Sequence, residues 1–345
     1  MAKRNQATKK QSSFSDEGVV EITTPDEVNI WEKPDTSSRG ILLFATGNPY
    51  YGEAALRLAA SLKYVDPTMK ITLVSDSFAQ IRAIDENKHL FESIISPNNA
   101  YLYQGGKRVD IRCKVFANEI SPYYETLMLD VDLIWLPKKT PTEFFNSMND
   151  KDFFIQNTGY ADLSKDDVDS QVDFYWAKIS DAKKAYSFTE GKFYQMTGEF
   201  VYFKKTDRVK EWFRTVQDVY DNCKVTSIAE FANQQCTDEL AYSIASVITG
   251  LYPSKDKYLP VYWPYRSKSF EFRMGNDYMS FADEFYALSV GGNLLPNNYK
   301  EQYELLAKGY YSKLKISAPT RLTEANRGSK STRKRRSNQN HCRSK

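Results

Sequence analysis

The residues from Glu125 to Pro137 read Glu-Thr-Leu-Met-Leu-Asp-Val-Asp-Leu-Ile-Trp-Leu-Pro. Two carboxylates, Asp130 and Asp132, interrupt this apolar run one residue apart. Burying an ionised carboxylate costs several kcal/mol unless a cation or hydrogen-bond donors offset the cost. Alternation along a strand would put both acids on one face, where they can hold Mg²⁺ or Mn²⁺. The stretch therefore predicts a buried strand that ends in a metal site, and such a metal can grip a diphosphate.

Apolar runs and helical patterns alternate ahead of this stretch. Gly40–Gly47 and Lys70–Asp76 are continuous apolar runs of the kind that form buried parallel strands, and Glu53–Tyr64 between them has an apolar helical face. This order predicts an α/β fold with a Rossmann-like, mostly parallel sheet flanked by helices. Ligands of such sheets lie outside the carboxyl ends of the strands. The residues expected at that crevice are Thr46, Gly47, Asp76, Asp130 and Asp132.

The second half of the chain continues the mixed pattern. A short strand is expected at Glu199–Phe203, an amphipathic helix at Arg208–Cys223, and a helix that Thr237 caps and that runs to about Val247. The remaining expectations are helices at Phe78–Asp85, Val109–Ile120 (with Ile111, Val115 and Ile120 in the core) and Asn298–Lys315, strands at Phe91–Ile95, Phe153–Gln156 and Phe285–Val290, and loops at Asn48–Gly52 and Ala161–Gln171.

Composition excludes several kinds of site. The chain has 345 residues, 41% of them hydrophobic, as in an ordinary globular protein. Its four cysteines show no CxxC spacing, which argues against a zinc site or a disulfide framework. With two histidines, a Ser-His-Asp triad is not expected. The start, Met1–Lys10, lacks the apolar core of a signal peptide, and no run is long enough to cross a membrane, so we expect a cytoplasmic protein.

Charge is distributed unevenly along the chain. Met1–Lys10 and Arg321–Lys345 together carry +12, so residues 11–320 carry −9 of the net +3. The ends are either solvated, disordered tails or a means of binding nucleic acid. We expect a disordered lead at 1–38, a folded domain at 39–318 with halves at 39–137 and 138–318, and a basic disordered tail at 319–345.

Several segments occur in the order typical of one enzyme family. Ile41–Gly47 followed by Tyr50–Leu62 is similar to a first strand and nucleotide-facing helix, and Lys114 ahead of Ser121–Asp132 is similar to a lysine followed by an "LDxD" strand. Thr197–Lys204 is similar to an Asn-Ser-Gly-hydrophobic strand, and Asp238-Glu239-Leu240 to an Asp-Gln-x-x-Leu helix start. Over about residues 40–250 the chain thus resembles nucleotide-sugar glycosyltransferases of the A-type (GT-A) fold, glycogenin-like or galactosyltransferase-like.

The resemblance implies a metal-dependent transfer of a hexosyl or pentosyl group from a nucleotide-diphosphate sugar. It favours a UDP-sugar as donor and retention of configuration at the transferred sugar. It also implies that 39–137 is the nucleotide-sugar half of a catalytic domain and 138–318 its acceptor half. It implies that Mn²⁺ or Mg²⁺ binds Asp130 and Asp132 and stabilises the departing diphosphate. Asp238 and Glu239 are the candidates for chemistry on the sugar. The residues expected to contact the donor are Thr46, Gly47, Tyr50, Asp76, Lys114, Thr197 and Gly198.

The chain departs from the family pattern at two places. The family takes a late histidine as its third metal ligand, but no histidine lies between His89 and His341. Gly291-Gly292-Asn293 falls in the corresponding part of the chain, so Asn293 is our expectation for the third ligand. Position 197 is Thr where the family has Ser.

Other interpretations of these residues stay open. Tyr50 can be a tyrosine that packs at the rim of the fold, and Asp76 can be a turn residue. Asp238 and Glu239 can be two acids that only balance the positive end of the helix dipole. For Arg112 we expect ordinary helix-surface charge. The whole chain can instead be a non-enzymatic binding protein tethered to nucleic acid by its tails, or a phosphatase of the haloacid-dehalogenase type. The acceptor is unidentified, and a hydroxylated DNA base is one candidate, because Arg333–Arg336 is basic.

Overall fold

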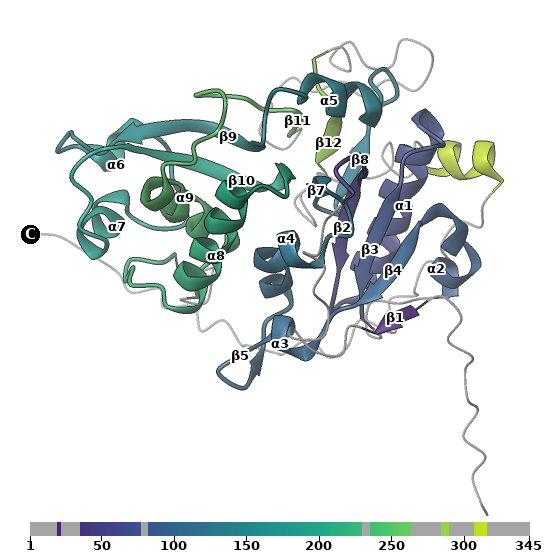
Figure 1. Cartoon of the computed structure of the whole chain (residues 1–345), viewed down its shortest axis with the longest axis horizontal. Helices are drawn as coiled ribbons and strands as arrows, with labels where there is room; N and C mark the ends of the chain where they lie inside the picture. Colours follow the sequence, from purple (N-terminus) through teal and green to yellow (C-terminus); the bar gives the residue numbers. More distant parts are fainter. Residues whose placement is uncertain are drawn as a thin grey trace, which may run out of the picture.

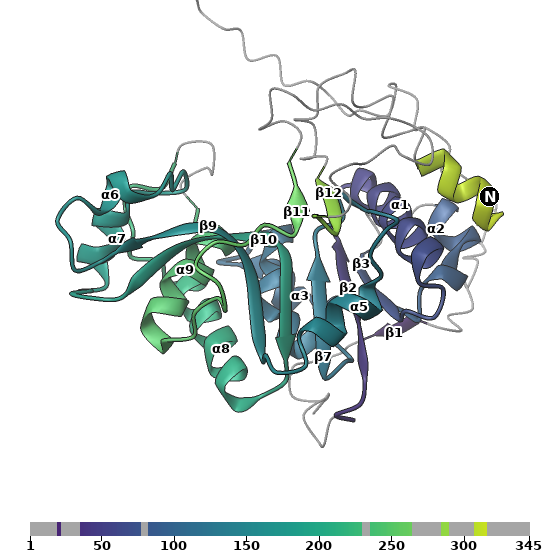
Figure 2. The same ribbon diagram turned by 90° about the horizontal axis from the view of Figure 1, so that it is seen from above.

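A computed structural model describes residues 19–21, 35–76, 82–229, 235–263, 284–289 and 307–315. Its centre is a seven-stranded sheet with the order β1-β4-β3-β2-β7-β10-β9 (Figures 1 and 2). The first five strands in this order are parallel, while β10 and β9 are antiparallel to their neighbours. The strands are β1 (Val19–Glu21), β2 (Arg39–Ala45), β3 (Ile71–Ser75), β4 (Ser93–Ser96), β7 (Glu125–Leu129), β9 (Phe153–Asp162) and β10 (Lys192–Lys204). The expected α/β fold class with a mixed, mostly parallel sheet is confirmed.

Helices cover both faces of this sheet. Side chains of β2 alternate between two cores: Ile41 and Leu43 pack with helix α1 (Pro49–Val65), whereas Leu42 and Phe44 pack with the helices of the opposite face. The other helical segments are α2 (Arg82–Glu86), η1 (Lys88–Leu90), α3 (Asn99–Leu102), η2 (Asp110–Phe116), α4 (Ala117–Ile120), α5 (Pro141–Ser147), α6 (Val168–Gln171), α7 (Ile179–Ala185), α8 (Asp207–Asp221) and α9 (Asp238–Thr249).

A second, smaller sheet packs beside the first. It has the order β11-β12-β8, made of β11 (Val261–Tyr262), β12 (Ala287–Ser289) and β8 (Leu133–Trp135). A small hairpin follows β4 in the chain. It consists of two antiparallel strands of two residues each, β5 (Tyr103–Gln104) and β6 (Lys107–Arg108). Because β7 belongs to the large sheet and β8 to the small one, the chain leaves one sheet and enters the other at Asp130–Asp132.

The structure corrects the interpretation of the stretch that contains these acids. We expected one strand with both carboxylates on one face, but β7 ends at Leu129 and β8 begins at Leu133. Asp130, Val131 and Asp132 form the turn between them. Residues in a turn do not alternate between the two faces of a sheet. Strand geometry therefore does not place Asp130 and Asp132 on one face, as we had expected.

Local capping explains where helices differ from expectation. Asn48 was expected in a loop, but its side chain accepts from the Tyr50 N–H and Pro49 takes the first helical position, so α1 begins four residues earlier than expected. The expected helix at 109–120 is mostly the 3-10 segment η2, and Ile111, expected in the core, is 42% exposed. Thr237 caps α9 as expected, through its hydroxyl and the Leu240 N–H.

The expectation for Arg112 is wrong, two expected strands are confirmed but are longer than expected, and part of one expected loop is a helix. Arg112 was expected on a helix surface, but it is buried and its guanidinium donates to both carboxylate oxygens of Asp221 at 2.9 and 2.7 Å. The strands expected at Phe153–Gln156 and Glu199–Phe203 are the longer β9 and β10, because the two pair as an extended hairpin. Within the loop expected at 161–171, Val168–Gln171 is helix α6.

The ends of the chain and one helix lie largely outside the described residues. The segment 1–38 was expected to be disordered, and of it Val19–Glu21 form β1, which pairs with β4. The expected tail 319–345 lies outside the described residues, as does all of 298–306, whereas 307–314 are helical as expected. In the described part of the chain, no helix is both long enough and apolar enough to cross a membrane.

Candidate functional site

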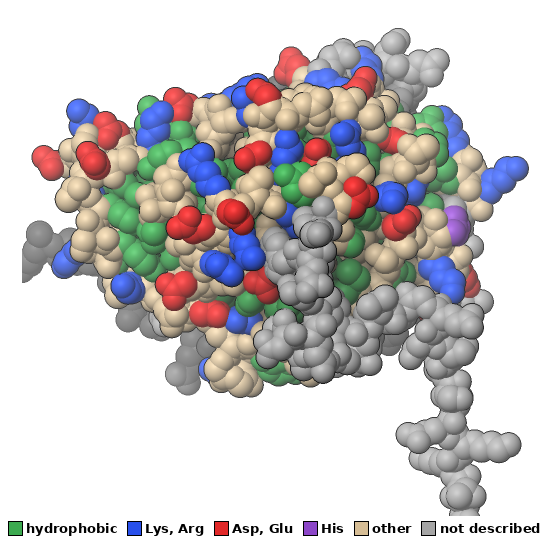
Figure 3. Space-filling view, in the orientation of Figure 1, with side chains coloured by type: hydrophobic (Ala, Val, Ile, Leu, Met, Phe, Trp, Pro, Cys, Tyr) green, Lys and Arg blue, Asp and Glu red, His purple; other side chains and the backbone are tan. Residues whose placement is uncertain are grey.

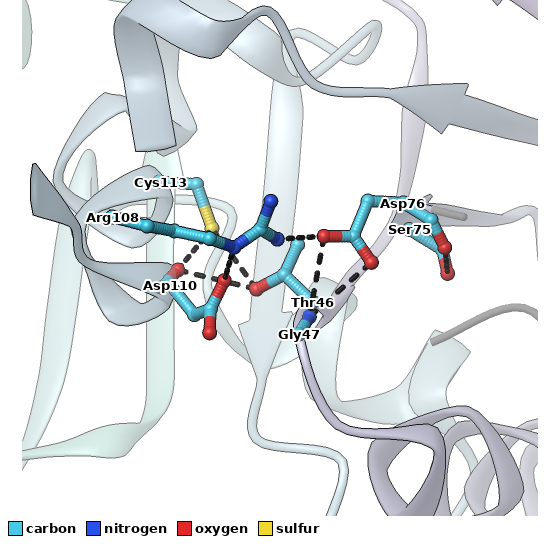
Figure 4. Close-up of polar contacts among 7 residues, drawn as sticks. All are labelled: Thr46, Gly47, Ser75, Asp76, Arg108, Asp110 and Cys113. Carbon is cyan, nitrogen blue, oxygen red and sulfur yellow. Dashed lines mark hydrogen bonds and ion pairs between the residues drawn. The ribbon is translucent and has the colours of Figure 1, made fainter. Parts of the chain in front are cut away.

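One cluster of charged side chains lies where β2 and β3 end (Figure 4). Arg108 forms an ion pair with Asp76, which follows β3, and its Nε donates to Asp110 Oδ1 at 2.7 Å. We call Asp76, Arg108 and Asp110 the arginine cluster. It brings together Thr46, Gly47 and Asp76 as the sequence predicted, because the carboxyl ends of neighbouring parallel strands meet at one sheet edge.

The backbone of β2 joins this cluster through Thr46 and Gly47. The Gly47 N–H donates to both Asp76 carboxylate oxygens, at 3.2 and 3.3 Å, and the Thr46 hydroxyl donates to the Asp110 carbonyl at 3.1 Å. Gly47 has φ +80°, and a Cβ there would lie 2.1 Å from Asp110 Oδ2. Only glycine satisfies both the left-handed backbone and the close carboxylate.

A second cluster forms around Lys114, on the segment η2. Lys114 Nζ forms an ion pair with Asp130 Oδ1 and lies 3.6 Å from Asp238 Oδ2. We call Lys114, Asp130 and Asp238 the lysine cluster. It joins the end of β7 to the first residue of α9, two positions more than one hundred residues apart in sequence. Three residues that the sequence singled out are thereby in direct contact.

Burial and neighbouring charge act against each other at Asp130. Burial raises the pKa of Asp130, the Lys114 ammonium lowers it, and the charges of Asp132 and Asp238 raise it, so that the pKa is about 6. The Asp130 N–H also donates to the Glu199 carbonyl at 3.0 Å, which fixes the strand end against β10. Asp130 is therefore a carboxylate whose neighbours favour additional positive charge.

Gly198 makes room for the second acid of the lysine cluster. A Cβ at Gly198 would lie 2.7 Å from Asp238 Oδ2 and 3.5 Å from Tyr242 Cε2. The buried hydroxyl of Thr197, one residue earlier, has no hydrogen-bond partner within the described part of the chain. The Thr-Gly dipeptide expected to contact the donor therefore packs against Asp238.

Glu239 follows Asp238 and is held by three donors. The Gly198 N–H donates to Oε1 at 3.1 Å, Tyr175 OH donates to Oε2 at 3.1 Å, and Trp176 Nε1 also donates to Oε2. Burial and then the charge of Asp238 raise the Glu239 pKa to about 7, against the three donors that lower it. The carboxyl group is thus fixed in position, and its surroundings favour the protonated form more than water does.

Glu199 is an acid that sequence reasoning missed as a site residue. Its carboxylate accepts from Trp263 Nε1 at 2.5 Å, Ser289 Oγ at 3.0 Å and Gln156 Nε2 at 3.4 Å. Burial, then the charges of Asp132 and Asp130, raise the Glu199 pKa to about 8. The available signal was a glutamate directly after Gly198 at the start of an apolar run.

Sequence reasoning also missed Arg108, Asp110, Tyr175 and Trp176. Arg108 and Asp110 lie on the hairpin and turn that follow β4, where no local pattern points to Asp76. Tyr175 and Trp176 lie in the connection between α6 and α7 and meet Glu239 only through the fold. Arg108, Tyr175 and Trp176 do not stand out by spacing, because the acids that they contact are 32 to 64 residues away. The Asp110 carboxylate joins the site only through Arg108.

Tyr50 and the expected third metal ligand are less closely tied to the site. The Tyr50 ring lies 5.8 Å from the Arg57 guanidinium and edge-on to Tyr51 at 5.7 Å, both within α1. Burial and then the charge of Asp132 raise the pKa of Tyr51, which places this second tyrosine near the acids. Asn293 lies outside the described residues.

The donor set fits a hard cation in charge and ligand type. Carboxylate oxygens are the ligands that Mg²⁺ and Mn²⁺ prefer. The charge of Asp132 raises the pKa of Asp130, and the charges of Asp132 and Asp130 raise the pKa of Glu199. Among the described residues, no group of three or more His, Cys, Asp or Glu is arranged to hold a metal. A site built from Asp130, Asp132 and Asn293 would contain two such residues and one amide that lies outside that range.

Charge on the molecular surface is mixed. Over the described residues of the face in Figure 3, Lys and Arg side chains are interspersed with Asp and Glu side chains. An interaction with nucleic acid therefore stays a prediction about the basic ends of the chain.

Solved structures with a similar fold include three glycosyltransferases. The apo form of the bifunctional glycosyltransferase WbbM shares 11% identity at a TM-score of 0.49; the match covers 81% of this chain and 52% of WbbM, so this chain spans about half its length. The galactosyltransferase LgtC with donor and acceptor sugar analogues shares 14% identity at 0.44, covering 78% and 95%. Mouse xyloside xylosyltransferase 1 shares 12% at 0.37, covering 61% and 82%.

Comparisons of sequence found no counterpart: no protein-family model matches the chain, and no curated protein matches it. The three solved structures are enzymes of the class whose motifs the sequence resembles. Because their TM-scores lie below 0.5, their activities do not extend to this chain.

Proposed function

We propose that this protein is a glycosyltransferase that moves a sugar from a nucleotide-diphosphate sugar to an acceptor hydroxyl. The observation that carries the proposal is Lys114, whose side chain is 14% exposed and which is shared between Asp130 and Asp238. The Lys114 ammonium is a cation that can bind a phosphate. It lies next to Asp130, one of the two acids proposed to bind a metal, and next to Asp238 at the start of helix α9, which also carries Glu239. Sugar transfer from such a donor needs these three elements at one place.

The donor would lie along the edge of the sheet between the two clusters. Thr46, Gly47 and Asp76 would contact the nucleoside, and Lys114 the diphosphate. Asp130 and Asp132, with Asn293 as third ligand, would hold Mn²⁺ or Mg²⁺. Such a metal supplies Lewis-acid stabilisation of the departing diphosphate. We favour a UDP-sugar with a hexosyl or pentosyl group.

The acids of α9 would act on the sugar. Asp238 and Glu239 lie side by side at the helix start, and Gly198, Tyr175 and Trp176 fix the Glu239 carboxyl group. We favour retention, in which a fixed acid steadies the positive charge that develops on the sugar as the donor bond breaks. The acceptor would supply a hydroxyl group, and a hydroxylated DNA base is one candidate through the basic tail.

Thermal melting with a panel of nucleotides tests the proposal. UDP, GDP, ADP and CDP are each added with and without Mn²⁺, because a ligand that binds the folded state raises the melting temperature. We expect one nucleotide, with UDP favoured, to stabilise the protein only when metal is present. If no nucleotide shifts the melting temperature under either condition, the proposal fails.

Two variants sharpen this experiment. Asp132→Asn removes one carboxylate from the proposed metal site and should abolish the metal-dependent shift and donor hydrolysis. Asp150→Asn is the matched control, because Asp150 is exposed and pairs only locally with Lys151 at 2.8 Å. An unchanged metal-dependent shift in Asp132→Asn would show that the pair does not hold the metal.

Deleting residues 321–345 tests the nucleic-acid part separately. If the tail binds the acceptor, the deletion weakens DNA binding and reduces its dependence on salt. Unchanged DNA binding in the deleted protein would remove the case for a DNA acceptor and leave the donor reaction untouched.

A further inference from the structure

Two neighbouring aromatic side chains contact the acid that the proposed reaction places beside the sugar. Tyr175 and Trp176 lie between α6 and α7, and both donate to the same oxygen of Glu239, Oε2. Their ring centroids are 4.9 Å apart, with the ring planes at 45°. Both residues are half-buried. The polar tips of the two rings are therefore directed at Glu239, while part of each residue remains accessible from outside.

The chain that carries this aromatic pair is held in place by the rest of the fold. The Trp176 carbonyl accepts from the Ala229 N–H at 2.9 Å. The ring of Phe174, directly before the pair, packs edge-on against Phe193 of β10 with the centroids 5.2 Å apart. A binding surface that is already ordered loses little conformational entropy when a ligand arrives.

The Glu239 carboxylate has room for one more donor. An ionised carboxylate offers about four acceptor positions. The Gly198 N–H occupies one position on Oε1, and Tyr175 and Trp176 occupy two on Oε2. A hydroxyl group that approaches along the aromatic pair can donate to the remaining position.

The aromatic pair lies away from the cation proposed to bind the diphosphate. Lys114 Nζ lies 3.6 Å from Asp238 Oδ2, whereas the next residue, Glu239, contacts the connection between α6 and α7. Consecutive residues of a helix point about 100° apart, so the two acids face different neighbours. Figure 1 shows α6 and α7 beside α9, at the opposite end of the molecule from α1. An acceptor can therefore lie on the aromatic pair without displacing the diphosphate.

The segment that leads to the aromatic pair is acidic. Residues 161–173 hold five aspartates and one lysine. Four of the aspartates are exposed: Asp166, Asp167, Asp169 and Asp173. Negative charge beside a binding surface repels the phosphate backbone of a nucleic acid but does not oppose a neutral molecule. The charge around the pair therefore favours an uncharged acceptor.

We propose that Tyr175 and Trp176 form an acceptor platform, which binds a neutral sugar ring of a carbohydrate acceptor and presents one of its hydroxyl groups to Glu239. This inference rests on the proposed function and names the class of its acceptor. A sugar ring has an apolar C–H face that packs on aromatic rings, and its hydroxyl groups form hydrogen bonds with acids at the rim. The acceptor platform supplies both kinds of contact at one place.

Tryptophan footprinting of the full-length protein tests the acceptor platform directly. An array of immobilised neutral oligosaccharides, probed without nucleotide or metal, identifies a sugar that binds. N-bromosuccinimide then oxidises accessible tryptophans with and without this sugar. Trypsin releases Trp176 in peptide 166–178 and Trp212, which is fully buried, in peptide 211–214. We expect the sugar to slow the oxidation of Trp176 several-fold and to leave Trp212 unchanged.

Three variants and one control locate the contact. Tyr175→Leu and Trp176→Leu each remove a ring and should weaken sugar binding at least about tenfold. Trp176→Phe keeps an aromatic face but loses the donor to Glu239, so it should weaken binding less than Trp176→Leu does. Tyr103→Leu is the control, because Tyr103 is an aromatic residue of β5 that is 42% exposed, and it should bind the sugar as the wild type does. Circular dichroism checks that each variant is folded.

The footprint on the wild-type protein decides the proposal even if a leucine variant does not fold. The proposal is overturned if no oligosaccharide on the array binds, if the bound sugar leaves Trp176 as reactive as before, or if single-stranded DNA protects Trp176 and no sugar does.

The two proposals can fail separately, because the footprint needs no nucleotide. A metal-dependent nucleotide shift without sugar protection of Trp176 would remove the acceptor platform and leave the transferase proposal standing. Sugar protection without any nucleotide shift would support the acceptor platform as a sugar-binding surface and remove the transferase proposal.

Discussion

The dipeptides Thr46-Gly47 and Thr197-Gly198 occupy equivalent places in the two charged clusters. In each, the glycine makes room for a carboxylate, of Asp110 or of Asp238. In each, a cation joins that carboxylate to an acid at the end of a strand: Arg108 joins Asp110 to Asp76, and Lys114 joins Asp238 to Asp130. The same arrangement of a Thr-Gly dipeptide, two acids and one cation thus occurs twice along one edge of the sheet.

The clusters differ in burial and in the acids around them. In the arginine cluster Arg108 is 25% and Asp110 42% exposed, whereas in the lysine cluster Lys114 is 14% and Asp238 5% exposed. The strand-end acids differ the other way, with Asp76 at 9% and Asp130 at 22%. Glu199 and Glu239 lie beside the lysine cluster with pKa values raised to about 8 and about 7. A buried site that crowds acids around one lysine gives up stability, and such a cost is typical of places where chemistry occurs. The arginine cluster can instead be explained as a support for the strand ends.

Removing each shared cation should have the largest effect and should separate the clusters. Lys114→Met should lower the free energy of unfolding by about 3–5 kcal/mol, because a buried pair that loses one partner leaves an uncompensated charge. Arg108→Met should cost about 1 kcal/mol, because its ion pairs are partly exposed to water. Urea unfolding followed by circular dichroism measures both, with Lys151→Met at an exposed pair as control. Equal losses at Lys114 and Arg108 would contradict the comparison.

Adding a methyl group at each glycine should have the next largest effect. Gly47→Ala should cost about 1–3 kcal/mol, from the left-handed backbone and the contact with Asp110. Gly106→Ala is the matched control, because Gly106 has φ +78° but open space at the Cβ position. The difference in free energy between these two variants measures the carboxylate contact alone. A Gly106→Ala loss as large as that of Gly47→Ala would show that Asp110 simply moves aside.

Gly198→Ala should show the opposite balance. Its φ is not left-handed, and the Asp238 carboxylate that the methyl group would meet can rotate, so the stability loss should be about 1 kcal/mol or less. The rotation takes Asp238 away from Lys114, so donor hydrolysis should fall at least about tenfold, which corresponds to about 1.4 kcal/mol in the barrier. Donor hydrolysis assays on Gly198→Ala and Gly47→Ala together test whether the lysine cluster is the one that acts on the donor.

The dependence of stability on pH should come mainly from Glu199 and Glu239, the two acids beside the lysine cluster. The folded state raises the pKa of Glu199 from 4.5 to about 8 and that of Glu239 to about 7, so it binds protons more tightly than the unfolded chain does. The stability that these protons give is complete below about pH 4.5 and is lost as the pH rises towards 8, at up to about 1.4 kcal/mol per pH unit for each group. Unfolding of the metal-free protein between pH 5 and 8.5 measures this loss.

Glu199→Gln supplies the control for this pH dependence. The amide keeps the shape of the side chain but does not titrate, so the fall in stability above pH 6 should become shallower. Glu143→Gln, at an exposed capping box far from the site, should leave the slope unchanged. If Glu199→Gln unfolds with the same pH dependence as the wild type, the raised Glu199 pKa is not the cause.

Sequence reasoning identified most members of the arginine and lysine clusters, but few of the residues that contact them. The strand ends at Thr46 and Asp76 followed from apolar runs that stop at polar residues, a local pattern that needs no tertiary information. Glu199, Arg108 and Trp176 did not follow, because each is defined by a partner in a distant segment. Periodicity shows which face of its own helix or strand a residue occupies. It does not show which side chains of another helix or strand pack against that face.

The turn at Asp130–Asp132 shows the same limit in the backbone. An apolar run that continues through Leu133–Leu136 looks like one strand, because both sheets bury it equally. The break is decided by hydrogen bonds: Leu129 pairs with β2 and β10, whereas Leu133 pairs with Ser289 of β12. Which strands are available as partners is a property of the whole fold, so sequence reasoning merged two strands into one.

The two threonines should give the smallest change in stability and the finest test of the comparison. The Thr46 hydroxyl donates to the Asp110 carbonyl at 3.1 Å, whereas the Thr197 hydroxyl is buried with no partner among the described residues. Thr46→Val should therefore cost about 1 kcal/mol, while Thr197→Val should change the free energy of unfolding by less than about 0.5 kcal/mol, since it removes a polar group that already lacks a bond.

Nucleotide binding should reverse this order. A buried hydroxyl that is left unbonded lowers stability, which favours the explanation that the Thr197 hydroxyl finds its partner on the donor. Thr197→Val should then weaken the metal-dependent thermal shift with the stabilising nucleotide, and Thr197→Ser, which keeps the hydroxyl, should preserve it. If Thr197→Val leaves that shift intact and Thr46→Val removes it, the arginine cluster rather than the lysine cluster is the part of the site that holds the donor.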